Sequence, residues 1–425
     1  MNRRTALTLA LLAAVAAPVF AETVVITGAT VHTMGPQGTV QGGSLVIENG
    51  RIKAVGPAVA APAGARIIDG RGKVVTPGLF DSLSRLGLVE VGQVAGTRDG
   101  RTEDDRITAA FSVADALNPR SSLIPVNRVE GLTRALVAPN PGASLIAGQG
   151  AVIHLGGPGD FIVRAPFGMF AVFGETGAEF AGGSRAAALL KLREAFEDAK
   201  DYAANRQAFD AGNRRDYALS RLDLAALGGV LQGTTPFVVA VHRASDIEAV
   251  LRLGKEYNLR LVLAGCAEGW KVADQIAKAK IPVLLSPLEN LPGSFETLGA
   301  TLENAARLHQ AGVTIAFMTA DAHNGRNLKQ AAGNAVTYGL PWQAALAAMT
   351  VNPARIWGLV DTYGTLEPGK DADVVIWDGD PLEVTTFADA VFIKGVEMPM
   401  ETRQTKLRDR YKDLGGPLPP AYRNP

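Results

Sequence analysis

The sequence has little of several features that mark particular classes of protein. Cys266 is the only cysteine in 425 residues, so the chain cannot form an internal disulfide, and burial is the simplest role for this thiol. Basic and acidic side chains number 42 each, and no strongly basic region marks a nucleic-acid-binding surface. We therefore expect no nucleic-acid partner and treat a small molecule as the default partner.

Two common functional motifs are also missing. No Gly-x-Ser-x-Gly sequence places a serine nucleophile on a sharp turn. The glycine-rich segment 127–157 lacks the Gly-x-x-x-x-Gly-Lys-[Ser/Thr] pattern of a phosphate-binding loop. We interpret this segment as tight turns and close packing within the fold.

The one long apolar run lies near the N-terminus. Arg3 and Arg4 precede apolar residues from Ala6 to Ala17, and a small-residue end follows. This pattern predicts a cleavable signal peptide over residues 1–21, with a membrane anchor as the alternative, and the paired arginines also fit twin-arginine export. Because no other apolar stretch reaches 18 residues, we expect a periplasmic or secreted mature chain without a membrane span.

Both ends of the remaining chain have the pattern of strands and turns. Residues 23–75 alternate apolar and polar side chains between turn dipeptides such as Asn49-Gly50. The stretch "YGTLEPGKDADVVIWDGDPLE" and the later "ADAVFIKGVEM" repeat this pattern. Since chain ends often lie together, we predict one small β-sandwich domain from residues 22–76 and 359–400, followed by a polar tail over residues 401–425.

The middle of the chain, residues 77–358, alternates strands with helices. Short apolar strands such as "FVVAVH" and "VTIAFMTAD" are separated by amphipathic stretches such as residues 244–257 and 295–312. This alternation is typical of a parallel sheet covered by helices on both faces. We predict an α/β fold with a (β/α)8 TIM barrel, and a doubly wound open sheet is the alternative.

Three stretches resemble a known family. They are "VVTPGLFDS" at the first barrel strand, "AVHRASDI" at residues 240–247, and "NLKQAAGNAVTYGLPWQAALAAMTVNPARIWGL" at residues 327–359. Together with residues 363–383 they resemble the amidohydrolase superfamily, and in particular its imidazolonepropionase-like branch. The resemblance implies a hydrolase of C–N bonds in small amides, cyclic amides or dipeptides, which acts through metal-activated water.

The resemblance also implies metal ligands at the carboxyl ends of the barrel strands. The family has His-x-His after the aspartate of its first strand, and we place Ser82 and Ser84 at these positions. Two residues that are two apart on a strand face the same way, so we expect both serines to line one cavity. Serine is a poor ligand for transition metals, and no histidine follows "LRLVLAG", so the metal site is degenerate.

The remaining residues of suitable type allow one metal ion at most. The resemblance makes His242 the ligand of the fifth strand and Asp321 both a ligand and the catalytic general base of the eighth strand. With His323 they could form a mononuclear site, for which zinc is one metal to consider, and the alternative is that no metal binds. Substrate-binding side chains are expected at Ser82, Ser84, Glu268 and Arg326.

Each of these residues also has a purely structural interpretation. His242 could form a hydrogen bond at the barrel mouth, Asp321 could cap a helix, and Glu268 could be a solvated loop carboxylate. Three functions therefore stay open for the chain. It could be a hydrolase with an altered site, a non-catalytic protein that binds a small molecule, or the partner of an active, homologous amidohydrolase subunit.

Overall fold

The computed structural model describes residues 22–412. The predicted signal peptide over residues 1–21 and the last part of the predicted tail lie outside the described residues. Within the described range, no helix is both long enough and apolar enough to span a membrane. Residues 403–411 of the tail form helix α11 (Arg403–Tyr411), which begins at the capping residue Thr402 and has no buried side chain.

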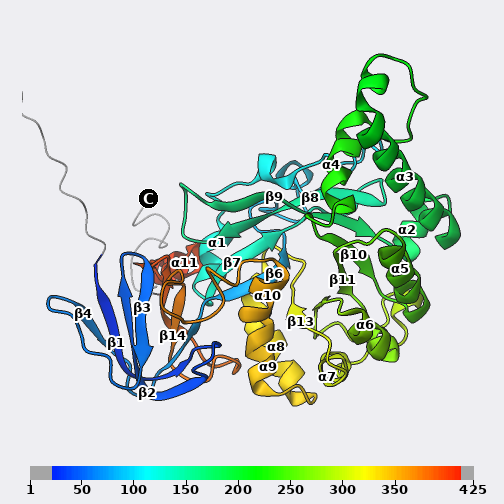
Figure 1. Cartoon of the computed structure of the whole chain (residues 1–425). Coiled ribbons are helices and arrows are strands. Elements are labelled where there is room, and N and C mark those ends of the chain that lie inside the picture. Colours follow the sequence, from blue (N-terminus) through cyan, green and yellow to red (C-terminus); the bar gives the residue numbers. More distant parts are fainter. Residues whose placement is uncertain (1–21, 413–425) are drawn as a thin grey trace, which may run out of the picture.

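The strands from both chain ends form one eight-stranded sheet (Figure 1), which confirms the predicted pairing of the ends. Its order is β16-β15-β14-β5-β1-β2-β3, with β4 paired to β1. The central joint is the antiparallel pairing of β5 with β14, in which Thr76 faces Val375. The strands are β1 (Val24–His32), β2 (Thr39–Glu48), β3 (Arg51–Gly56), β4 (Arg66–Asp69), β5 (Val74–Pro77), β14 (Val374–Trp377), β15 (Ala388–Ile393) and β16 (Val396–Glu397).

The middle of the chain forms a second eight-stranded sheet, which curls into a nearly closed barrel and confirms the predicted α/β fold. Its strands follow one another in chain order from β6 to β13. The backbone N–H of Ala320 donates to the carbonyl of Leu83 at 2.8 Å, so the segment after the last strand joins the first strand. The strands are β6 (Leu79–Ser84), β7 (Leu132–Val137), β8 (Ile146–His154), β9 (Ile162–Val172), β10 (Phe237–Val241), β11 (Leu261–Gly265), β12 (Val283–Leu285) and β13 (Ile315–Phe317).

One barrel strand departs from the expected parallel pattern. Strand β8 is antiparallel to both β7 and β9, and no helix separates these three strands. It runs through the glycine-rich segment that we interpreted as turns. A Cβ atom at Gly150 would lie 2.7 Å from the carbonyl oxygen of Val137, so this strand needs glycine for close packing. Such glycines interrupt the apolar alternation by which a strand is recognised.

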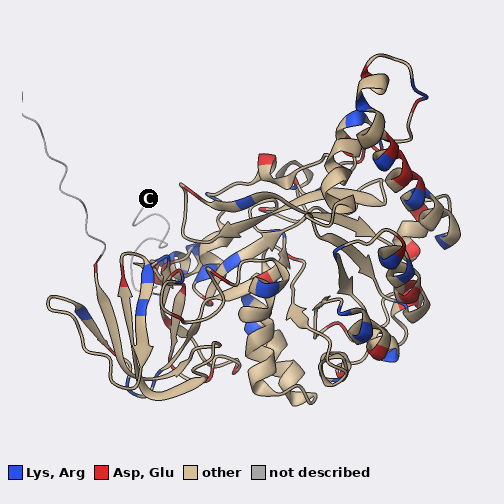
Figure 2. Ribbon diagram, viewed as in Figure 1, with Lys and Arg blue, Asp and Glu red and all other residues tan. Residues whose placement is uncertain are grey.

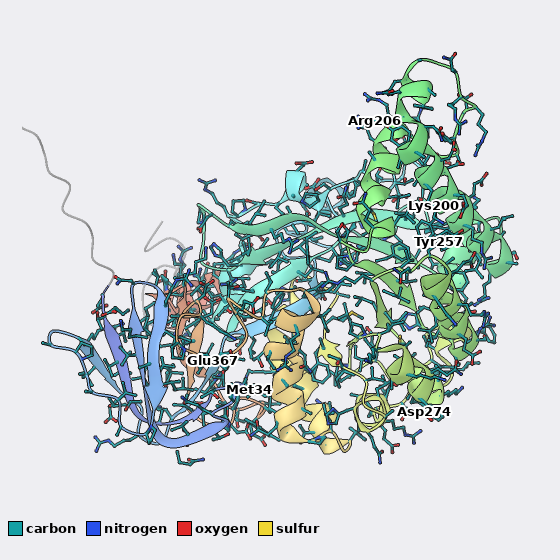
Figure 3. The ribbon with its side chains drawn as sticks, in the orientation of Figure 1. Met34, Lys200, Arg206, Tyr257, Asp274 and Glu367 are labelled. Atoms are coloured by element: carbon teal, nitrogen blue, oxygen red, sulfur yellow. The ribbon has the colours of Figure 1, made fainter. Side chains whose placement is uncertain are left out.

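Helices cover the outside of the barrel, and most lie where the sequence predicts them. Helices α3 and α4 project from the side opposite the end-derived sheet (Figure 1), and α3 carries charges of both signs (Figure 2). The Nζ atom of Lys200 on α3 lies 4.3 Å from the ring centre of Tyr257, which follows α5 (Figure 3). The helices are α1 (Leu123–Arg128), α2 (Glu175–Phe180), α3 (Arg185–Asp210), α4 (Arg221–Leu231), α5 (Ala244–Glu256), α6 (Ala273–Ala279), α7 (Asn304–Gln310), α8 (Leu328–Thr337), α9 (Trp342–Ala348) and α10 (Val351–Ile356).

One predicted helix is shorter than expected. The amphipathic stretch 295–312 becomes helix α7 only from Asn304, and residues 298–303 form a loop. A single 3₁₀ turn, Phe295–Thr297, precedes that loop. The side chains of Phe295 and Leu298, which the helical pattern would bury, are 82% and 63% exposed. This loop matters because it forms a wall of a cavity of about 420 Å³ at the barrel mouth.

Two apolar layers fill the barrel and its surroundings. The inner layer contains Phe80, Leu136, Val238 and Leu284, which come from different barrel strands. The outer layer lies between the strands and the helices and includes Val239 from the same strand as Val238. Alternation along each strand therefore decides which side chains can reach the interior. At the carboxyl ends of the strands these inward positions line the candidate site.

Candidate functional site

A β-bulge at the end of β6 decides which side chains enter the barrel mouth. Asp81 pairs with Ala135 and Ser84 pairs with Val137, so three steps along β6 match only two along β7. As a result, Leu83 and Arg85 line a small cavity of about 50 Å³ inside the mouth, and neither serine does. The prediction that Ser82 and Ser84 face one cavity is therefore corrected, because simple alternation does not hold across the bulge.

The two serines have other surroundings. The hydroxyl of Ser84 donates to the backbone carbonyl of Asp321 at 3.0 Å and accepts from the N–H of Leu86 at 3.3 Å. The hydroxyl of Ser82 is fully buried and has no hydrogen-bond partner within residues 22–412. Ser84 thus helps to join the first barrel strand to the segment after the last one. Neither serine is placed to contact a ligand in a described cavity.

Arg85 brings a positive charge into the barrel mouth. Its Nε atom donates to the side-chain oxygen of Asn140, and its Nη1 atom donates to the carbonyl of Ser84 at 3.1 Å. Burial lowers the pKa of Arg85 to about 10, while the carboxylates of Asp81 and Asp321 act in the opposite direction. The guanidinium therefore stays protonated at neutral pH.

Asp81 is used to hold two strands together. Its carboxylate is fully buried and accepts hydrogen bonds from the backbone N–H groups of Thr319 at 3.0 Å and Leu83 at 3.2 Å, and from the Thr319 hydroxyl. Burial raises the pKa of Asp81 to about 7, although these hydrogen bonds favour the charged form. Asp81 thereby links the first strand to the segment that follows the last one.

The carboxylate of Asp321 forms its hydrogen bonds within its own loop. Its Oδ1 atom accepts from the N–H of His323 at 2.9 Å, and its Oδ2 atom accepts from the side-chain amide of Asn324 at 2.8 Å. These bonds fix the loop that leads into a short 3₁₀ helix, Asn324–Asn327, and His323 itself is exposed. The carboxylate oxygens of Asp321 are therefore already used as acceptors by neighbours in the chain.

The structure does not assemble the expected metal site. Within the described part of the chain, no three His, Cys, Asp or Glu side chains are grouped so that they could hold a metal ion. The three-ligand site of His242, Asp321 and His323 is therefore corrected. The barrel mouth instead presents Leu83, which has no donor atom, and Arg85, whose charge repels a cation. These two side chains are not of a type that a catalytic metal uses as ligands.

Two further predicted substrate-binding residues lie elsewhere. Glu268 accepts from the N–H of Ala244 at the start of α5, at 3.0 Å, and from Lys271 at 2.6 Å. It is therefore held in a structural role. Arg326 lines a separate cavity of about 250 Å³ together with Glu130 and Lys329. The structure does not bring either residue to the cavity that His242 lines.

His242 lines a cavity of about 420 Å³ at the carboxyl ends of β10, β11 and β12. Gly265 at the end of β11 makes room for the imidazole, because a Cβ atom there would lie 2.5 Å from Cε1 of His242. Burial lowers the pKa of His242, with the charges of Glu289 and Glu175 opposing this shift. A mainly neutral imidazole therefore faces a cavity of the size that small-molecule sites have.

The loop between β12 and α7 forms the outer wall of this cavity and is fixed in place. The N–H of Glu175 donates to the Glu296 carboxylate at 2.7 Å, and the N–H of Glu296 donates to the Glu175 carboxylate at 2.9 Å. The indole of Trp270 donates to the carbonyl of Gly299 at 2.8 Å. Hydrogen bonds at Glu296 and at Gly299 therefore hold this wall of the cavity in position.

Cys266 has the structural role that the sequence suggested. It is fully buried between Gly265 and Ala267, which line this cavity, and burial raises the pKa of its thiol. Its backbone carbonyl accepts from the side-chain amide of Asn304 at 2.9 Å, which attaches the start of α7 to the end of β11. The thiol is neither ionised nor accessible.

Comparison with known proteins places the chain in a family. The model of the amidohydrolase family matches residues 195–400. The crystal structure of an amidohydrolase from Thermotoga maritima MSB8 has 30% sequence identity and a TM-score of 0.80, and the match covers 88% of this chain and 99% of that one. The chain therefore belongs to the amidohydrolase family, whose members are hydrolases and are generally metal-dependent.

Two named relatives are similar over most of this chain. Amidohydrolase tasK of Hapsidospora irregularis is 26% identical over 387 residues, which are 83% of this chain and 39% of tasK, so the chain spans about two fifths of that protein. An imidazolonepropionase of Symbiobacterium thermophilum is 28% identical over 372 residues, covering 79% of this chain and 84% of that protein. An adenosine deaminase from Xanthomonas campestris, solved with bound zinc, shares the fold with a TM-score of 0.51 at 15% identity.

Proposed function

We propose that this amidohydrolase-family protein binds a small molecule in the cavity beside His242 and does not perform metal-dependent hydrolysis. The observation that carries the proposal is the pair Leu83 and Arg85 at the barrel mouth. An aliphatic side chain and a protonated guanidinium stand where a metal would need neutral or anionic donors. On this proposal the family's metal site does not form at the barrel axis, while a cavity of ligand size lies beside it.

The sizes of the two cavities support binding without catalysis at the barrel axis. The cavity that Leu83 and Arg85 line measures about 50 Å³, which leaves no room for a substrate. The cavity beside His242 measures about 420 Å³, which falls within the range of roughly 300–1,000 Å³ for small-molecule sites. A ligand would therefore lie over strands β10–β12, displaced from the centre of the barrel.

A hydrolase with an altered site is the second candidate function. It is favoured by the names of similar proteins, which include imidazolonepropionases and a 5-methylthioadenosine/S-adenosylhomocysteine deaminase. The residue for it is His242, because a largely neutral imidazole beside a cavity can accept a proton from water. Such a hydrolase would act on C–N bonds without a metal and would depend on His242 alone.

We also propose that the protein is exported, to the periplasm or beyond the cell. Support comes from the composition of residues 1–21, with paired arginines before a short apolar run. Assembly with an active amidohydrolase subunit remains a proposal, and it would give a non-catalytic chain a role beside a catalytic one. Purification from the native source, followed by identification of any homologous chain that stays bound, tests this proposal.

The proposed function is tested by activity and binding measurements on the mature chain. We expect no hydrolysis of a panel of amides, cyclic amides and dipeptides, with or without added zinc. We expect some member of a small-molecule panel to raise the melting temperature of the wild type and to have a smaller effect on His242→Ala. Hydrolysis that zinc restores after chelation would overturn the proposal, and metal-independent hydrolysis lost in His242→Ala would favour the second candidate.

A further inference from the structure

The cavity beside His242 has an uneven distribution of charge. The titratable residues that line it are His242 and Glu289, and no lysine or arginine does so. The charge of Glu175, which does not line the cavity, also acts on the imidazole. We infer that this cavity selects a ligand with a compact apolar body and a positively charged amine. The inference rests on the proposed function and names the chemical class of its ligand.

Glu289 is available to pair with such an amine. It lies in the loop after β12, its side chain is exposed, and it forms no ion pair within residues 22–412. The nearby cations are already occupied by other carboxylates. Arg185 pairs with Asp246 at 2.8 Å, and Lys271 pairs with Glu268 at 2.6 Å. A protonated amine in the cavity would therefore find an unneutralised carboxylate.

The imidazole does not oppose a positive ligand. Burial favours the neutral form of His242, so the ring adds no positive charge to the cavity at neutral pH. A neutral ring keeps one nitrogen as an acceptor and the other as a donor. It can accept a hydrogen bond from an ammonium group while Glu289 supplies the opposite charge. An anionic ligand would meet the carboxylate of Glu289 and no cation in the lining.

The other residues that line the cavity are the reason for expecting an apolar body in the ligand. Leucine side chains and small residues make up much of the wall, and the leucines give it apolar surface. The residues that contribute the larger apolar side chains are Leu285, Leu288, Leu291 and Leu302. Burial of a hydrocarbon group against them would supply affinity, and the amine would supply orientation.

Matched triplets of small ligands test this inference on the full mature chain. Each triplet holds the carbon skeleton constant and changes the charge, as in cyclohexylmethylamine, cyclohexylmethanol and cyclohexanecarboxylate, or benzylamine, benzyl alcohol and benzoate. Binding is measured by ligand-observed NMR at neutral pH. We expect the amine to bind most tightly in each triplet, with the alcohol weaker and the carboxylate weakest.

Two variants connect this preference to the cavity. In Glu289→Gln we expect amine affinity to fall by roughly tenfold, as for the loss of one charge-assisted hydrogen bond, with little change for the alcohol. Glu179→Gln, at an exposed position on α2 outside the cavity lining, is the matched control and should bind like the wild type.

Three results would overturn the inference: carboxylates that bind as well as amines, an amine preference that is unchanged in Glu289→Gln, or no binding of any amine. None of these would bear on the metal and hydrolysis measurements that test the proposed function. Equal binding of alcohols and amines would also overturn the inference, and it would indicate a small-molecule site for a neutral ligand. The two proposals can therefore fail separately.

Discussion

The Ser84 hydroxyl donates a hydrogen bond to the backbone carbonyl of Asp321 at 3.0 Å. The backbone N–H of Arg85 donates to the same carbonyl, also at 3.0 Å. These two bonds join the end of the first barrel strand to the segment after the last one. The side chain that enters the barrel mouth is therefore that of Arg85, while Ser84 helps to join the first strand to the segment after the last one.

This arrangement predicts which substitutions would introduce a metal site. Leu83→His with Arg85→His removes the cation and places two imidazoles at the barrel mouth, so we expect the double variant to retain zinc on desalting. Ser82→His with Ser84→His is the matched control, and we expect no gain because these side chains do not line the mouth. Metal analysis and circular dichroism of both variants test this. If only the Ser82→His/Ser84→His variant gained zinc, our conclusion that Leu83 and Arg85 face the barrel mouth and the serines do not would be refuted.

Asp81 should make stability depend on pH. Burial raises its pKa to about 7 in the folded chain, so between about pH 4 and pH 7 the folded state binds the proton more tightly than the unfolded state. Its contribution to the free energy of unfolding therefore falls as the pH rises through this window, by on the order of 2–4 kcal/mol. Asp81→Asn should remove this part of the dependence. Urea unfolding at pH 5 and pH 8 measures it.

An exposed position provides the control for Asp81. Asp115→Asn changes the same chemical group at an exposed site and should leave the pH dependence as it is in the wild type. If Asp81→Asn and the wild type lose stability equally between pH 5 and pH 8, the carboxylate is already ionised at pH 5. The guanidinium of Arg85, which favours the ionised form, would then dominate over burial.

The contact between the barrel and the end-derived sheet depends on a buried arginine. Arg134 on β7 is 1% exposed and donates to the carboxylate of Asp373 at 2.9 Å, and Asp373 is equally buried. Arg134→Met should cost about 3–5 kcal/mol, because it leaves a buried carboxylate unpaired. Arg193→Met breaks the exposed pair with Glu256 and should cost less than about 1 kcal/mol. Similar urea midpoints for both variants would count against this account.

Gly265 should control the position of His242. Gly265→Ala adds a Cβ atom 2.5 Å from the ring at a backbone φ of +86°, so we expect the imidazole to move and ligand binding to weaken. Gly233→Ala is matched for backbone strain at φ +72° but meets no atom within 4 Å. The chain has five histidines, so the His242 Cε1–H resonance can be followed by NMR. An unshifted resonance in Gly265→Ala, or an equal shift in Gly233→Ala, would contradict the prediction.

The sequence was most informative where a pattern repeats over many residues. The apolar strands and amphipathic helices after Phe237 have clear periods, and they indicated the α/β barrel. The paired strands at the two chain ends were predicted for the same reason. Strand β8 was missed because glycines such as Gly150 interrupt its alternation, and only its packing against β7 and β9 shows why they are needed.

The candidate site was predictable in part. His242 was placed correctly at the carboxyl end of a barrel strand, since that position follows from the strand itself. The inward-facing side chains of β6 were predicted wrongly. A bulge moves the inward face of the strand by one residue, and nothing in the local sequence indicates the bulge. Glu289 was missed because its loop is fixed by contacts distant in sequence.

Zinc binding by the wild-type mature chain is the most direct test of our central claim. The protein is treated with a chelator, incubated with excess zinc, desalted and analysed for metal, with Leu83→His/Arg85→His measured in parallel. We predict that zinc in the wild type stays far below one ion per chain, because Leu83 and Arg85 offer no ligand at the barrel mouth. Zinc retained near one ion per chain by the wild type, and lost in His242→Ala, would contradict the account.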